Sequence, residues 1–394
     1  MNAGQSANTA WTWGQYSVFR VVFGTWLAVH FAMLVPWGAE LFAATGVLPD
    51  GHASPLLRLF PNVFLLDDSP AFVTGVLVAA TALAVVFLFG WHDRTAALLL
   101  WFVQASMYGR NPLTGNPGLP YVGLLLLVHV GLPRAPHGGW VRHGQLEARR
   151  DWRVPRALHR VVWILMSTGY SYSGWMKLQS PSWCDGSALA KVLVNPLAHA
   201  EGLGPCLLAM PAWVLQGMTW GALALELGFV VFALSGRLRP FAWAAMLAMH
   251  CVLLLLIDFA DLSLGMVMLH LFTCDPAWLP PRRAKGQTAL EVHCDPASAI
   301  DQRWVRFLRA EAPTEDAFRF VAHGSAVADC APKAALPRQV DPVAVLFALG
   351  GVWRAFGHAV ALLPAWLRNA AVATARCGLR PLCRGAAVDC NSMG

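Results

Sequence analysis

Long apolar runs alternate with short polar segments over residues 1–280 of the chain. A helix needs about 20 apolar residues to cross the roughly 30 Å of hydrocarbon in a lipid bilayer. Eight runs reach or approach this length, at residues 17–36, 71–89, 94–110, 119–133, 157–178, 209–235, 240–258 and 262–273. The pattern therefore predicts an all-α polytopic membrane bundle of about eight transmembrane helices, formed by residues 1–280.

The pattern changes after Pro281. Residues 286–394 mix charged positions with amphipathic stretches such as DQRWVRFLRA, which predicts a separate small cytoplasmic domain. The segment 343–366 is apolar enough to resemble a ninth span, but four glycine or polar positions interrupt it: Gly350, Gly351, Arg354 and His358. We expect an amphipathic helix pair there, lying on the membrane or on the core of the domain.

The composition indicates that lipid is the solvent for most of the chain. Of the 394 residues, 57% are hydrophobic and only 13% are charged, against about 25% charged in soluble domains. The formal net charge is +7, but the basic residues stand in short loops between apolar runs. That placement is typical of cytoplasmic membrane loops and not of a nucleic-acid surface. No cleavable signal peptide is evident, so we expect the first run to stay as a membrane helix.

Charge placement predicts the orientation in the membrane. The loop between the fourth and fifth runs carries Arg134, Arg142, Arg149, Arg150, Arg153 and Arg156. Basic loops of this kind stay in the cytoplasm. Counting from this loop places both termini inside and residues 37–70 and 179–208 outside. We therefore expect a multi-pass protein of a bacterial inner (plasma) membrane, with the lipid bilayer as a partner and the oligomeric state open.

Two pairings follow from this topology. Arg20 in the first run and Glu226 in the sixth have similar depths, and burying either charge without a partner would be costly. We expect an intramembrane ion pair between them, as a structural clasp in preference to a proton path. Cys184 and Cys206 are the only cysteines placed outside, in an oxidising compartment, which predicts a disulfide between them.

Polar side chains gather toward the outer side of the predicted bundle. Lys177 stands where the fifth run meets polar sequence, in YSYSGWMKLQSPSWCDG. Taken singly, a terminal lysine snorkels to the surface and a membrane histidine bonds a backbone group. Together, a candidate base with imidazoles, phenols and carboxylates could form a pocket. The pocket candidates are His30, Gln104, Tyr170, Tyr172, Trp183, Asp185 and His250. No histidine or glutamate pair has metal-site spacing on a membrane helix, so we expect no metal.

The same stretch resembles the signature of the HTTM membrane family, whose best-known members are the vitamin K-dependent gamma-glutamyl carboxylases. The likeness consists of an aromatic-rich helix end, Gly174, a Lys-Leu pair that contains Lys177, and then Trp183 with an acidic residue and a glycine. The runs FRVVFGTWLAVHFA and YGRNPLTGNPGLPYVGLLLLVHVGLPRAP are similar to the family at the level of pattern. The resemblance covers about residues 15–275.

The resemblance implies a chemistry. In the carboxylases, the lysine that matches Lys177 is the base that starts oxidation of reduced vitamin K, and the oxygenated quinone then deprotonates glutamate before carbon dioxide adds. The implied cofactor is therefore a reduced quinone, by resemblance alone. The carboxylases carry Asn-Asn-His before the fourth span, whereas this chain has GNPG at 115–118, with no histidine. This departure argues against glutamate carboxylation itself.

The C-terminal region has its own resemblance. RWVRFL at 303–308, with similar matches further along, resembles the DCC-type thiol–disulfide oxidoreductases, which have a thioredoxin-like α/β fold. Members carry a CxxC motif just before the helix that matches Trp304. Alignment on Trp304 places Ser298 and Asp301 at the two cysteine positions. Neither residue can form the mixed disulfide that exchange requires, so the resemblance implies a degenerate, redox-inactive domain at 286–394.

Two functions remain open. The first is a membrane enzyme related to the carboxylases, with Lys177 as base at the outer face and a quinol or another lipid-soluble molecule as substrate. The second is a non-catalytic membrane partner or maturation factor that binds a peptide, a lipid or a protein. In that case Lys177 is a structural contact. Thiol–disulfide exchange by the C-terminal domain is not expected.

Overall fold

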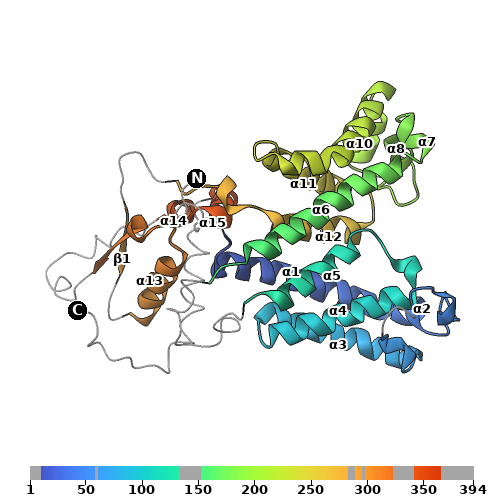
Figure 1. Ribbon diagram of the computed structural model, residues 1–394, viewed down its shortest axis with the longest axis horizontal. Coiled ribbons are helices and arrows are strands. Elements are labelled where there is room, and N and C mark those ends of the chain that lie inside the picture. The colour runs from blue at the N-terminus through green and yellow to red at the C-terminus, as the bar shows by residue number, and fades with distance from the viewer. Residues whose placement is uncertain are drawn as a thin grey trace.

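The computed structural model describes residues 10–57, 61–133, 152–282, 289–294, 298–322 and 341–364. Within these ranges the chain is mostly helical, with one small sheet (Figure 1). The part of the basic loop that carries Arg134, Arg142, Arg149 and Arg150 lies outside the described residues.

Helices joined by short turns build the N-terminal part of the chain. The longer ones are α1 (Trp13–Leu34), α3 (Pro70–Phe89), α4 (Asp93–Arg110), α6 (Arg156–Lys177), α10 (Ala212–Leu234) and α11 (Arg239–Leu256). The shorter ones are α2 (Gly38–Phe42), α5 (Leu119–Gly131), α7 (Pro181–Cys184), α8 (Ala188–Leu193), α9 (Leu203–Leu208) and α12 (Ala260–Thr273). Local sequence sets several boundaries. For example, the Ser69 hydroxyl caps α3, which ends at Gly90 with a positive φ of 71°.

All eight predicted segments are helical, but they differ in length and polarity. Four helical stretches are long and apolar enough to cross a membrane: Trp13–Phe42, Pro70–Phe89, Ala212–Leu234 and Arg239–Leu256. α4 and α6 are of similar length but more polar, and α5 and α12 have only 13 and 14 residues. The chain is therefore a helical multi-pass membrane protein. Among the described residues it has four clear spans, and not the eight that the apolar pattern predicts.

The helices pack mainly on near neighbours in the sequence. α1 packs on α3, α3 on α4 and α4 on α5, while α6 packs on α10 and α11 on α12. α12 also contacts α5, which joins the two groups (Figure 1). Buried aromatic rings of Phe19, Phe23, Phe87 and Phe272 stack between α1, α3 and α12. This cluster lies at the centre of the largest core.

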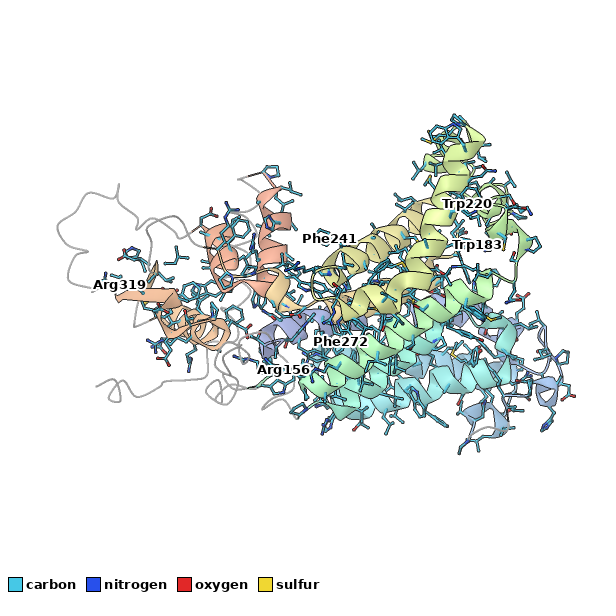
Figure 2. The ribbon with its side chains drawn as sticks, turned by 45° about the horizontal axis from the view of Figure 1, so that its top comes forward. Arg156, Trp183, Trp220, Phe241, Phe272 and Arg319 are labelled. Carbon is cyan, nitrogen blue, oxygen red and sulfur yellow. The ribbon has the colours of Figure 1, made fainter. Side chains whose placement is uncertain are left out.

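We name the two ends of the bundle by their charges. The arginine end holds the start of α6 at Arg156, the end of α5 at Gly131 and the start of α4 at Asp93. The lysine end holds Lys177, the last residue of α6, and the loop with Trp183 that follows it. Figure 2 shows Arg156 and Trp183 at opposite ends of the bundle, with Arg156 on the side of the C-terminal domain.

The C-terminal domain is a small α/β unit. Strand β1 (Leu290–Cys294) pairs in parallel with β2 (Phe318–Ala322), and α13 (Ala299–Glu311) lies between them in sequence. The predicted helix pair is confirmed as α14 (Pro342–Leu349) and α15 (Gly351–Ala361), and α14 packs on the domain core. The assignment of this unit as thioredoxin-like stays a prediction.

This domain contacts the start of α1 through Glu311. The buried carboxylate accepts hydrogen bonds from the Thr12 hydroxyl, from the Gly14 N–H at 2.9 Å and from Trp353 Nε1 at 2.9 Å. A carboxylate at a helix N-terminus satisfies free N–H groups and interacts favourably with the helix dipole. Burial raises the pKa of Glu311, and the hydrogen bonds oppose that rise. The domain is therefore docked on the arginine end.

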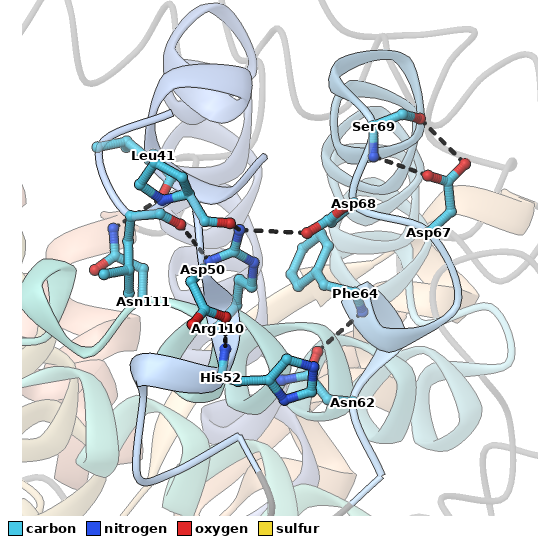
Figure 3. Close-up of polar contacts among 12 residues, drawn as sticks. Leu41, Asp50, His52, Asn62, Phe64, Asp67, Asp68, Ser69, Arg110 and Asn111 are labelled. Carbon is cyan, nitrogen blue, oxygen red and sulfur yellow. Dashed lines mark hydrogen bonds and ion pairs between the residues drawn. The ribbon is translucent and has the colours of Figure 1, made fainter. Parts of the chain in front are cut away.

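At the lysine end, Arg110 and Asn111 fasten the segment between α1 and α3 (Figure 3). Arg110 Nη1 donates to the carbonyl oxygen of Leu48 at 2.8 Å, and Nη2 lies 3.4 Å from Asp68 Oδ2. Asn111 Nδ2 donates to the carbonyl oxygen of Leu41 at 2.7 Å. Both side chains are buried, so they replace water as partners of the loop backbone.

Candidate functional site at the lysine end

Gly174 sets the distance between α6 and α10. A Cβ atom there would lie 2.7 Å from the backbone nitrogen of Leu227 and 3.1 Å from the carbonyl carbon of Glu226. Any larger residue would therefore push the two helices apart. The Ser171 hydroxyl donates to the carbonyl oxygens of Leu227 at 3.0 Å and Glu226 at 3.2 Å. The SYSG part of the signature thus holds the two backbones in direct contact.

One turn after Gly174, Lys177 faces Glu226. The Lys177 Nζ atom donates to both carboxylate oxygens of Glu226. The Glu226 side chain is 5% exposed and the Lys177 side chain is 25% exposed, so the carboxylate is buried while the ammonium reaches the surface. The ammonium also lies 4.6 Å from the centre of the Trp183 ring, a cation–π contact. Of the predicted pocket candidates, Trp183 thus lies directly beside Lys177, together with the carboxylate of Glu226.

The predicted ion pair between Arg20 and Glu226 is wrong. Glu226 pairs with Lys177, and Arg20 Nη1 lies 3.6 Å from Asp93 Oδ2. The physical reason is helix packing, because α1 packs on α3 whereas α10 packs on α6. The first turns of α10 also lean away from the rest of the bundle (Figures 1 and 2). Arg20 lies at the arginine end and Glu226 at the lysine end, so the similar depth expected for the two residues is wrong as well.

A buried phenol and two buried imidazoles lie next to the ion pair. Tyr170 Oη is 2.8 Å from His250 Nε2, and the rings of His250 and His270 are 5.9 Å apart. Tyr170 stands seven residues, about two turns, before Lys177 on the same face of α6. The structure thus brings Tyr170 and His250 of the predicted pocket near Lys177. It adds His270, which sequence reasoning missed, although an imidazole in an apolar helix was the available signal.

Two other predicted pocket residues have partners elsewhere. His30 Nδ1 lies 3.0 Å from Asp261 Oδ1 at the start of α12. Gln104 Nε2 donates to the carbonyl oxygen of Leu119 at the start of α5, at 2.8 Å. Both side chains are buried. They join α1 to α12 and α4 to α5, and within the described part of the chain no hydrogen bond or ion pair connects them to Lys177.

The last two predicted pocket residues are exposed. Tyr172 is 65% exposed on α6. Asp185 stands in the loop after α7, where its carboxylate accepts a hydrogen bond from the Ser187 N–H at 2.8 Å. Hydrogen bonds from Ser187 lower the pKa of Asp185. These two residues shape the loop and the helix surface around the ion pair, but they do not contact it.

The predicted disulfide between Cys184 and Cys206 is not formed. Both residues are free, exposed thiols. Cys184 Sγ instead donates to the carbonyl oxygen of Leu178 at 3.4 Å, within the turn after α6. Cys206 lies on α9, which packs on α8 and α11. Sharing one outer loop is not sufficient for a bridge, which requires Cα atoms about 4.4–6.8 Å apart.

The sequence interpretation missed a polar cluster at the arginine end. Asp93 Oδ2 lies 3.6 Å from Arg20 Nη1 and 3.3 Å from His129 Nε2. His129 Nδ1 lies 2.5 Å from Tyr16 Oη. The available signal was His129 itself, an imidazole within the apolar run LLLLVHVGL. Asp93 stands one residue outside the predicted segment 94–110, which hides its place in the bundle.

Two positions that depart from the resembled families have structural roles. Asn116, in the GNPG segment, is buried, and its Oδ1 accepts the N–H groups of Gly118 at 2.9 Å and Leu119 at 3.2 Å. Ser298 is the N-cap of α13, and its hydroxyl accepts the Asp301 N–H at 3.2 Å. Ser298, one of the two positions that the resemblance aligns with CxxC cysteines, therefore caps α13, and Asp301 supplies the backbone N–H that it accepts.

No family model, curated protein or solved structure matches this chain. Within the described ranges, no group of three or more His, Cys, Asp and Glu side chains could hold a metal ion.

Proposed function

We propose that this chain is a membrane enzyme that takes a proton from a lipid-soluble hydroxyl compound at the lysine end. The compound is a quinol if the resemblance to the carboxylases extends to chemistry. One observation carries the proposal: a buried carboxylate, Glu226, contacts a lysine that is partly open to the surface. A base at a membrane boundary needs a buried neighbouring group that can accept its proton, and it needs a surface from which the substrate can reach it.

The proposal includes the eight-span arrangement in a bacterial inner membrane. Helices α4, α5, α6 and α12 would complete the four clear spans, because successive long helices run between the same two ends of the bundle. The arginine end would face the cytoplasm, since the arginine-rich segment 134–156 joins α5 to α6 there. The lysine end and its ion pair would then face outward.

Proton transfer within the pair would make Lys177 a base. An ion pair in a poorly hydrated site loses much of the solvation that stabilises charges in water, so the neutral amine and carboxylic acid become accessible. The proton moves from Lys177 Nζ to a carboxylate oxygen of Glu226. Lys177 Nζ then takes the proton of the substrate hydroxyl. The substrate oxygen ends as an anion beside the Lys177 ammonium, the extra proton stays on Glu226, and the net charge is unchanged.

The surroundings fit an aromatic substrate with a hydroxyl group. Trp183 presents a ring beside the ammonium, and aromatic rings pack on one another in offset or edge-to-face geometry. A quinol would supply an acidic hydroxyl and, once deprotonated, a ring that dioxygen can oxidise. Tyr170 and His250 form a hydrogen-bonded wall on the buried side.

Oxygen uptake tests this function. The purified chain in lipid nanodiscs would be given reduced menaquinone or vitamin K hydroquinone. We expect uptake that is lost in Lys177→Ala and in Lys177→Arg, since an arginine keeps the charge but cannot act as a base. Glu226→Gln should lose it as well. The exposed Lys191, on the same outer loop, gives the matched control Lys191→Ala, which should behave like the wild type.

A non-catalytic role is the second candidate, favoured by one observation. Both Glu226 oxygens and the Trp183 ring contact Lys177 in its charged form, as an anchor between α6, α10 and the outer loop would. Absence of uptake by well-folded wild type would favour this role. Lys177→Arg would then keep the folded yield of the wild type while Lys177→Ala reduces it.

A further inference from the structure

The arginine end contains a cavity that the proposed reaction does not use. Its volume is about 310 Å³, at the lower end of the roughly 300–1,000 Å³ of small-molecule sites. The side chains that matter around it are Arg20, Arg94, Asp93, His129, Trp13 and Trp152. It lies at the opposite end of α6 from Lys177, so it is independent of the proposed function.

Arg20 provides the main reason to expect a ligand there. Its side chain is 2% exposed, yet only Nη1 has a partner, Asp93 Oδ2 at 3.6 Å. Nε and Nη2 have no hydrogen-bond partner among the described residues. The same oxygen of Asp93 also contacts His129 Nε2 at 3.3 Å, so Asp93 offers Arg20 only one long contact. A buried guanidinium with two unpaired donor atoms is costly, and an anion in the cavity would remove that cost.

The position of the guanidinium is fixed by the backbone. At Gly90, which has a φ of 71°, a Cβ atom would lie 2.7 Å from the guanidinium carbon of Arg20. The group is therefore held against the turn between α3 and α4 by a residue that has no side chain. Arg20 lines the cavity, and its side chain is almost fully buried.

Two further features make the cavity electropositive. Arg94 also lines it and is held there by a hydrogen bond to the carbonyl oxygen of Leu132. The N-terminus of α4 begins at the cavity with Asp93, and helix N-termini attract anions through their free N–H groups and dipole. Two arginines against one aspartate leave an excess of positive charge.

We infer that this cavity binds the phosphate group of an anionic membrane lipid, with Arg20 and Arg94 as its ligands. Arginine is the side chain best suited to phosphate, because its donors match two phosphate oxygens. Trp13 and Trp152 also line the cavity, and tryptophan is common at the membrane–water interface. Pro133 and Trp152, on either side of the arginine-rich part of the chain, are both lining residues. Headgroups of anionic lipids concentrate beside basic segments at the membrane surface.

Lipid retention tests the inference directly. The full chain is reconstituted in nanodiscs of phosphatidylcholine with a minor fraction of phosphatidylglycerol, and the lipids that remain bound are measured by native mass spectrometry. We expect phosphatidylglycerol to be enriched over its bulk ratio in the wild type. In Arg20→Gln the enrichment should fall at least about tenfold, as expected for losing a hydrogen bond between charged groups.

Two further variants separate binding from folding. Thr95 is exposed and lines the cavity, so Thr95→Phe fills it without touching the Arg20–Asp93 pair and should also remove the enrichment. Arg237 is exposed in the turn before α11, so Arg237→Gln removes a surface cation at the same end and should keep it.

Inorganic phosphate distinguishes the source of the ligand. In phosphatidylcholine nanodiscs, a rise in Tm with phosphate over chloride at equal ionic strength, lost in Arg20→Gln, would support a phosphate site filled from solution. Phosphatidylglycerol enrichment that depends on Arg20 supports the lipid source. If neither effect occurs, or if both survive in Arg20→Gln and Thr95→Phe, the inference is overturned.

Discussion

Arg20 and Arg110 are both almost fully buried, with side chains 2% and 1% exposed. Arg110, at the lysine end, donates to the Leu48 carbonyl oxygen at 2.8 Å and contacts a second carbonyl and Asp68 at 3.5 and 3.4 Å. Only its Nε lacks a partner among the described residues. Arg20, at the arginine end, has one carboxylate at 3.6 Å, and its other two nitrogens are unpaired within the same ranges.

The contrast shows that burial alone does not reveal what a buried arginine does. The number of acceptors that the chain itself supplies is more informative. Arg110 has enough of them to act as a staple for the loop between α1 and α3, whereas Arg20 has room for an acceptor from outside. Removing each charge should therefore have different consequences.

Arg110→Met should give the largest loss of stability. It leaves two loop carbonyl groups without their donor and Asp68 without its counter-charge, a loss of about 3–5 kcal/mol. Thermal unfolding in detergent measures it, with limited proteolysis of residues 43–69 as a local readout. A loss no larger than that of Arg237→Met would contradict the role of Arg110 as a staple.

Arg20→Met should cost less, about 1–2 kcal/mol, which is common for single substitutions. The substitution removes a charge that is poorly compensated, and Asp93 keeps its contact with His129 at 3.3 Å. The same unfolding measurement compares the two arginine variants. If Arg20→Met destabilises the chain more than Arg110→Met, the comparison between the two sites fails.

Glu311 is an acidic counterpart of Arg110, since three donors surround its buried carboxylate. Burial raises its pKa, so the Glu311 carboxyl group binds its proton more tightly when the C-terminal domain is docked than when it is undocked. The stabilisation of docking that depends on this proton is complete below the ordinary glutamate pKa of about 4.5. It is lost as the pH rises through the raised pKa.

We therefore expect docking to protect the backbone amides at the start of α1 from hydrogen exchange more strongly at low pH, after correction for intrinsic exchange rates. Glu311→Gln should abolish this pH dependence while changing stability by only about 1 kcal/mol. Glu291→Gln, at an exposed position of β1, is the control. Identical pH dependence in both variants would rule out Glu311 as its source.

The smallest effect is expected for an exposed pair. Arg319 and Glu291 lie 3.4 Å apart across β1 and β2, with side chains 72% and 54% exposed. Water and salt screen such pairs, so Arg319→Ala should change stability by about 0–1 kcal/mol. Denaturant unfolding at low and high salt measures it. A larger effect would mean that this pair is part of a network.

The sequence was sufficient to locate the helices but not to pair them. Apolar runs longer than a turn or two leave few alternatives to a helix in lipid, and all eight predicted segments are helical. Which helices touch depends on close approaches such as Gly174 on α10, whose effect is visible only in three dimensions. Glu226 lies beside Lys177 at the lysine end and not beside Arg20, because the packing of α10 on α6 sets its partner.

The sequence also does not show which of two possible roles a residue has in the structure. Ser298 and Asp301 differ from a CxxC motif in sequence, but the role of Ser298 as the N-cap of α13 follows only from the start of the helix at this point. Cys184 could bond Cys206 or a nearby carbonyl, and loop membership does not decide between them. Asp93 lies one residue before the predicted run 94–110, so the sequence pattern does not place it in the bundle with Arg20 and His129.

The shortness of α5 has a consequence for the membrane itself. Its 13 residues rise about 20 Å, roughly 10 Å less than the hydrocarbon layer. In an eight-span arrangement, irregular backbone at 111–118 fills the difference, which lipid does not tolerate unless protein groups replace water. Asn111 and Asn116 do so, because both are buried and hydrogen-bonded to backbone groups. In that arrangement the two asparagines would hold a re-entrant loop and would set how deeply polar backbone descends below the headgroups at the lysine end.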